Sequence, residues 1–303
     1  MSAYPEAPAG WVRVSHRSAG PFTTHVTFRG ADGLETEWSS RVHRKHASRI
    51  SRSAPGDEDV WWAPHRASWW IGLLFAIGAT CFTVGPLPGF VELVGSAVDA
   101  AVFFAGSIFF TTAAGLQCLE TFSADREAGG SGPHRFRVLA FEPRRIDWWS
   151  SVVQFVGTLF FNVTTFRAMS TALESPSYDR LVWAPDAVGS MCFLVSGYLA
   201  YVEVCGGYAC LRRRGLEWWI AAVNFVGCIA FGISAVAAYV VPSTGSALDL
   251  AAANAFTALG GLCFLVCAVL LLPEAAAERA ASSRWGVGSV TSSEERAARP
   301  DGS

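Results

Sequence analysis

Charged side chains are scarce in this chain of 303 residues. Only 16% of its residues are charged, against about 25% in a typical soluble domain, whereas 51% are hydrophobic. This deficit excludes a disordered chain and a nucleic-acid-binding tail, so we expect no nucleic acid among the partners. A formal net charge of −2 also provides no strong field that would attract an acidic or basic partner.

Basic residues are missing altogether from six long apolar stretches. Each stretch approaches the ~20 residues that a membrane-crossing helix needs, and each is apolar on every side, unlike a soluble helix. We therefore expect an all-α integral membrane protein with six transmembrane helices rather than a soluble bundle of buried helices. The expected spans are Trp69–Pro86, Val98–Cys118, Trp148–Phe166, Pro185–Val204, Trp218–Val241 and Leu250–Leu272.

The arginines predict the orientation of these spans. Of the 23 basic residues, 21 precede Trp69 or lie in the segments 119–147, 205–217 and 273–303. Because such residues concentrate on the cytoplasmic side, we expect a multi-pass plasma-membrane protein with both termini in the cytoplasm. No apolar signal peptide is visible, so the first span would act as an uncleaved anchor.

A pattern of tryptophan, glycine and phenylalanine occurs three times along the chain. Each copy begins with a pair of tryptophans, namely Trp69-Trp70, Trp148-Trp149 or Trp218-Trp219. Eight residues after the second tryptophan stands a glycine: Gly78, Gly157 or Gly227. Four residues after the glycine stands a phenylalanine: Phe82, Phe161 or Phe231. The partner helices place Phe110, Phe193 and Phe264 four residues after Gly106, Gly189 and Gly260, and Glu120, Glu203 and Glu274 fourteen residues after them.

The repeated unit is a helical hairpin, with copies at about 67–122, 146–205 and 216–274. Each copy would enter and leave on the cytoplasmic side, so the three hairpins are parallel and related by an axis along the membrane normal. We predict a pseudo-threefold bundle; a linear row of hairpins is the alternative.

The repeated residues suggest roles in anchoring and packing. The tryptophans stand at the depth that indole rings prefer in a membrane interface, and the glycines allow helix backbones to approach closely. The glutamates lie at helix C-termini, where the helix dipole disfavours a carboxylate, so they need partners such as the indole N–H groups or Arg66, Arg145 and Arg214. Each glutamate is either hydrogen-bonded, so that it ties the foot of one helix to its neighbour, or a solvated loop residue. The alternative is that the three carboxylates form a ring around the axis, which would be a cytoplasmic vestibule for cations.

Five amides lie within the expected spans, and three of them, Gln154, Asn162 and Asn224, are candidates for a polar lining. They either form hydrogen bonds between helices or line a path for a small solute. The eight cysteines show no spacing typical of zinc or disulfide frameworks. We therefore expect all eight to be apolar fillers, and Cys205 and Cys210 to be reduced in the cytoplasm. No metal or cofactor is expected.

Polar tails flank the membrane domain, which we place at 67–273. In the tail 1–66, alternation over Phe22–Trp38 around Ala31-Asp32-Gly33 predicts a small β-hairpin. The following basic segment, from Arg41 to Arg52, either binds anionic lipid or only determines topology. The tail 274–303 is expected to be partly disordered.

Sequence motifs of common enzymes are absent. The chain has no Walker A, dinucleotide-binding, G-x-S-x-G or H-E-x-x-H sequence, and no histidine in a span. We therefore do not expect an enzyme.

The strings Phe104–Phe110, Trp148–Phe161 and Gly189-Ser190 resemble the YrhK-like bacterial membrane proteins, including larger multi-span actinobacterial members. The resemblance covers about 66–273 and implies no activity. We expect a structural or accessory membrane module that packs with itself or with another membrane protein. The alternatives are a transporter or channel for small solutes or ions that uses the glutamate ring, and a sensor of membrane state.

Overall fold

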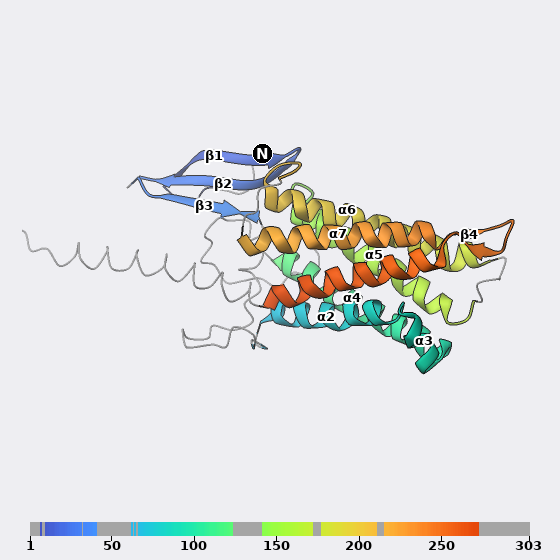
Figure 1. Ribbon diagram of the computed structural model, residues 1–303. Helices are drawn as coiled ribbons and strands as arrows, with labels where there is room; N and C mark the ends of the chain where they lie inside the picture. The colour runs from blue at the N-terminus through green and yellow to red at the C-terminus, as the bar shows by residue number, and fades with distance from the viewer. Residues whose placement is uncertain are drawn as a thin grey trace, which may run out of the picture.

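The computed structural model places a small β-sheet at one end of a long helical bundle (Figure 1). It describes residues 7, 10–31, 33–40, 62, 64, 66–123, 141–171, 177–210 and 215–272. Glu274, the basic segment from Arg41 to Arg52 and the C-terminal tail lie outside the described residues.

The sheet is antiparallel, with the order β1-β2-β3. Its strands are β1 (Trp11–Ala19), β2 (Phe22–Gly30) and β3 (Glu35–Ser39). The side chains of Thr24, Val26 and Phe28 alternate along β2 and are buried. β1 was not expected from the sequence, although Val12, Arg13, Val14 and Ser15 alternate between apolar and polar types; most of its side chains are exposed.

Five helices of the described residues are long and apolar enough to cross a membrane. They are α2 (Ala67–Val84), α4 (Ser96–Ser123), α6 (Ala184–Cys205) with the preceding π-helical turn η1 (Asp179–Trp183), α7 (Gly215–Ala237) and a last helix over Leu250–Leu272. The chain therefore has the helices of a multi-pass membrane protein. Two smaller elements lie at the opposite end from the sheet: α3 (Pro88–Val94), and a hairpin of β4 (Val240–Val241) and β5 (Ser246–Ala247).

The helix α5 (Ile146–Ala168), the remaining expected span, is not among these five. Its 23 residues are enough to cross a bilayer, but polar residues lower its apolar character. The polar residues buried along it are Asp147, Ser150, Ser151, Thr158, Thr164 and Thr165. α5 packs between α4 and α6, and Ser150 Oγ, for example, donates to the Ser196 carbonyl oxygen at 3.0 Å. The polar side of α5 thus faces other helices.

The bundle closes on itself. Along the chain, α2 packs against α4, α4 against α5, α5 against α6, and α6 against α7. The last helix contacts α7, where Ser234 Oγ donates to the Ala253 carbonyl oxygen at 2.8 Å. It also packs closely against α2. A methyl group added to Gly261 of the last helix would lie only 2.7 Å from the backbone nitrogen of Thr83 in α2. The six long helices therefore form a closed ring in chain order.

Candidate functional site

Six phenylalanines meet in the middle of the bundle, two from each hairpin. The rings of Phe82, Phe161 and Phe231 stand edge-on to one another, with centroids separated by 6.1, 5.9 and 5.8 Å. Each of these rings also packs against the phenylalanine of its own hairpin, at centroid distances of 5.6, 4.9 and 5.3 Å. These partners are Phe110, Phe193 and Phe264. We call the six residues the phenylalanine plug.

The plug leaves a cavity of only about 10 Å³, lined by the six rings, Ser107 and Thr158. This is at most the space of a single water molecule. The two hydroxyl groups are already used within the protein: Ser107 Oγ lies 2.9 Å from Thr165 Oγ1, and Thr158 Oγ1 donates to the Phe155 carbonyl oxygen at 2.7 Å. In the part of the chain that the structure describes, side chains therefore fill the centre of the bundle.

The repeated glycines lie where the two helices of each hairpin touch. In all three hairpins, the carbonyl oxygen of the first glycine is 3.2 or 3.3 Å from the position that a methyl group would take on the second. The pairs are Gly78 with Gly106, Gly157 with Gly189, and Gly227 with Gly260. A methyl group on any of the six would also approach a phenylalanine of the plug or a cysteine to within 2.6 to 3.0 Å. These contacts leave no room for a side chain.

The three amides do not line the central cavity. Asn162 Nδ2 donates to Thr111 Oγ1 at 2.9 Å and so links α5 to α4. Asn224 Nδ2 lies 3.9 Å from Cys228 Sγ, one turn further along the same helix. Gln154 is half-buried on α5. The three amides therefore do not come together in one polar site.

Of the repeated glutamates, Glu203 is the most clearly placed. Its side chain is only 2% exposed and accepts a hydrogen bond from the Oγ of Ser40, the residue that follows β3. Glu203 thus ties the end of the sheet to the foot of α6. Glu120 is half-buried near the end of α4.

The tryptophan pairs share one geometry and donate to the backbone. Within each pair the rings stand edge-on, with centroids 4.9 to 5.1 Å apart. The indoles of Trp70 and Trp149 donate to the carbonyl oxygens of Pro64 and Pro143, each six residues earlier. In the sequence, a proline six residues before the second tryptophan is the signal of this contact.

A buried ionic cluster joins the end of α4 to the start of α5. Arg145 is 4% exposed, and its guanidinium pairs with the carboxylates of Asp147 and Glu142. It also donates to the carbonyl oxygen of Thr121 at 3.0 Å. Sequence reasoning considered Arg145 only as a partner for the repeated glutamates and missed the two acidic residues beside it.

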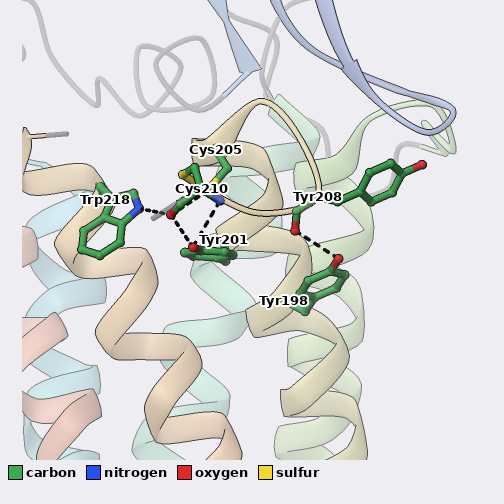
Figure 2. The surroundings of a disulfide bond; sticks show 6 residues. All are labelled: Tyr198, Tyr201, Cys205, Tyr208, Cys210 and Trp218. Atoms are coloured by element: carbon green, nitrogen blue, oxygen red, sulfur yellow. Dashed lines mark hydrogen bonds between the residues drawn. A yellow bond between two sulfur atoms is a disulfide. The ribbon is translucent and has the colours of Figure 1, made fainter. Parts of the chain in front are cut away.

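The expectation that Cys205 and Cys210 are reduced is wrong. Cys205 and Cys210 form a disulfide (Figure 2). Gly206 ends α6 in the left-handed conformation, at φ +64°, and reverses the chain, so the two Cα atoms come within 5.4 Å. The free cysteines are Cys81, Cys118, Cys192, Cys228, Cys263 and Cys267. Among the described residues, no group of three His, Cys, Asp or Glu side chains could hold a metal ion.

Hydrogen bonds hold the disulfide loop independently of the disulfide (Figure 2). Tyr201 Oη donates to the Cys210 carbonyl oxygen at 2.6 Å and accepts from the Cys210 N–H at 3.4 Å. Trp218 Nε1, at the start of α7, donates to the same carbonyl oxygen at 3.1 Å. Tyr198 Oη donates to the Tyr208 carbonyl oxygen at 3.2 Å. The loop is thus attached to both α6 and α7.

No protein-family model, curated protein or solved structure matches the chain.

Proposed function

We propose that this chain is a non-enzymatic structural or accessory module of the plasma membrane, with both termini in the cytoplasm, that packs with itself or with another membrane protein. The observation that carries the proposal is the phenylalanine plug. Six aromatic rings occupy the position where a transporter would need a solute path, and the remaining cavity holds at most about one water molecule.

The proposal includes three parallel hairpins around a pseudo-threefold axis, with α5 as the sixth span. The glycine contacts that recur in each hairpin support it, as does the triangle formed by Phe82, Phe161 and Phe231. The polar side chains of α5 are buried against neighbouring helices, which favours a span despite its lower apolar character. The resemblance to YrhK-like proteins is part of the same proposal and rests on the three sequence strings alone.

Polar groups between the helices also favour packing over transport. Serine and threonine hydroxyls bridge neighbouring helices, as in the bond from Ser190 Oγ to the Phe231 carbonyl oxygen at 3.4 Å. Such bonds contribute about 0.6–2 kcal/mol each to the association of membrane helices. A polar path for solutes would instead need groups that remain available to water or to an ion.

Flux through proteoliposomes tests this proposal. We expect purified protein to pass Na⁺, K⁺ and small neutral solutes no faster than protein-free vesicles, with valinomycin as a check that K⁺ flux is detectable. Glu203→Gln tests the glutamate-ring alternative, and Glu92→Gln, at an exposed site on α3, is its matched control. Flux in the wild type that disappears in Glu203→Gln but persists in Glu92→Gln would overturn the proposal.

A further inference from the structure

The disulfide lies at the arginine-rich end of the bundle. Cys205 is the last residue of α6, and Cys210 is followed after one residue by Arg212, Arg213 and Arg214. By the distribution of basic residues, this end faces the cytoplasm. Disulfides in the cytosol are rare, and those that occur are usually transient and take part in catalysis or redox sensing. The position of this disulfide therefore points to a labile bond.

We propose that Cys205 and Cys210 form a reversible thiol–disulfide exchange site, whose reaction partner is a cytosolic protein with two thiols, of the thioredoxin class. The proposal rests on the orientation given under the proposed function, and goes beyond the structural role stated there. It requires that the pair can open and close without unfolding the bundle.

Hydrogen bonds keep the two cysteines close together when the bond between them is open. The carbonyl oxygen of Cys210 accepts from Tyr201 Oη and Trp218 Nε1, and its N–H donates to Tyr201 Oη. None of these bonds involves a sulfur atom, so they remain after reduction. Cys205 is fixed by the last turn of α6. A reduced pair held in this way can close again in an intramolecular reaction, which has a high effective concentration.

The two sulfur atoms differ in their ability to leave as thiolates. Cys205 is the last residue of α6, where the helix dipole disfavours a thiolate, whereas Cys210 lies beyond the end of the helix. Because the sulfur with the lower pKa leaves faster, the incoming thiolate should attack Cys205 Sγ.

The exchange then proceeds in two steps. The thiolate of the reductant forms a bond to Cys205 Sγ, the disulfide breaks, and Cys210 leaves as a thiolate. The second thiol of the reductant is then deprotonated and attacks the reductant's first sulfur, which is bonded to Cys205 Sγ in the mixed disulfide. This step releases Cys205. The reductant has lost two electrons and two protons and is now a disulfide, and both cysteines are thiols.

The loop between the cysteines contacts the N-terminal sheet. A methyl group on Gly20, in the β1–β2 turn, would lie 3.3 Å from Tyr208 Oη, and one on Gly206 would lie 3.3 Å from His25 Nδ1. Glu203, two residues before Cys205, bonds to Ser40 at the end of the sheet. The disulfide loop therefore lies where the sheet rests on α6.

Thiol labelling in membrane vesicles tests the proposal. Inside-out and right-side-out vesicles containing the full chain are incubated with reduced thioredoxin, which cannot cross the membrane, then quenched with acid, denatured and labelled with a maleimide polymer. We expect two more adducts than in the untreated sample, only in inside-out vesicles, and we expect oxidised glutathione to remove them. The double variant Cys205→Ser/Cys210→Ser should show no change under any of these conditions.

Three outcomes would overturn the exchange site. The first is a pair that reacts only after denaturation, as a purely structural disulfide would. The second is a pair that is reduced from the start and resists oxidised glutathione. The third is a pair that reacts only in right-side-out vesicles, which would also refute the proposed orientation; the first two outcomes leave the orientation and the proposed membrane module standing.

Tyr201 is assigned as the positioning residue of this site. Tyr201→Phe should slow closure of the reduced pair about fivefold, as expected for the loss of a hydrogen bond, while the number of adducts after full reduction stays the same. Tyr239→Phe, at the opposite end of the bundle, is the control and should close at the wild-type rate. Equal closure rates in the two variants would refute this role for Tyr201.

Discussion

At the scale of single residues, the packing of this bundle depends on what surrounds each glycine. Around Gly157 the nearest atoms are Cys192 Cβ and ring carbons of Phe193, at 2.9 and 3.0 Å from an added methyl group. Around Gly261 they are the backbone atoms Thr83 N and Phe82 C, at 2.7 and 2.8 Å from an added methyl group. Backbone atoms cannot turn away, so Gly261 is the least tolerant of the glycines that join the last helix to α2.

Gly261→Ala should lower the free energy of unfolding by about 1–3 kcal/mol, the usual cost of overpacking a well-filled interior. Thermal unfolding in detergent, followed by circular dichroism, measures this as a lower midpoint. Gly89→Ala in α3 is the matched control, because nothing lies within 4 Å of the added methyl group. An unchanged midpoint in Gly261→Ala would mean that the last helix does not pack against α2 as closely as described.

At the scale of elements, ionic and polar contacts connect the helix ends on the side of the sheet. The cluster around Arg145 connects α4 to α5, and Glu203 connects α6 to the segment after β3. A buried charge that loses its partner is costly, because no water replaces the missing interaction. The exposed pair of Arg29 and Glu35 in the sheet offers a comparison, since salt bridges in water contribute about 0–1 kcal/mol.

Asp147→Ala should therefore destabilise the protein by about 3–5 kcal/mol, since it leaves the buried Arg145 without one of its carboxylates. Glu35→Ala removes the acidic partner of the exposed pair and should cost about 1 kcal/mol or less. Unfolding with denaturant in mixed micelles gives both values. Similar losses in the two variants would show that water reaches Arg145.

The sequence predicted the elements unevenly, for physical reasons. Long apolar runs predicted all six long helices, and five of them are apolar enough to cross a membrane. α5 is the helix predicted over Trp148–Phe166, but the polar residues buried along it lower its hydropathy. β1 was missed because the alternation of Val12, Arg13, Val14 and Ser15 was not weighed. The disulfide was missed because only the cytosolic setting was weighed, and the Gly206-Gly207 reversal between the cysteines was not.

At the scale of the whole molecule, the phenylalanine plug is where the three hairpins meet. The regular spacing of glycine and phenylalanine in the sequence singled out all six of its residues, although only as packing partners within hairpins. That the six rings converge could not be read from the sequence, because convergence depends on the order in which the helices surround the centre. The amides, which the sequence placed either in hydrogen bonds between helices or along a solute path, do not line the cavity.

Phe161→Ala should open a cavity in the plug and destabilise the protein by about 3–5 kcal/mol. Phe166→Ala, five residues later on the same helix, is the control: the side chain of Phe166 is 54% exposed and that of Phe161 is 5% exposed. Thermal unfolding of both variants in one detergent makes the comparison. If both variants lose the same small amount of unfolding free energy, the ring of Phe161 contributes no more to stability than the exposed ring of Phe166 does.

The contact between the last helix and α2 has a consequence for how the bundle comes apart. In an open array of repeats, the units at the two ends have one neighbour each and can separate first. Here every hairpin has two neighbours, so detaching any of them breaks two helix contacts and uncovers the central rings. The chain should therefore lose its membrane domain in a single cooperative transition, with no hairpin fraying ahead of the others.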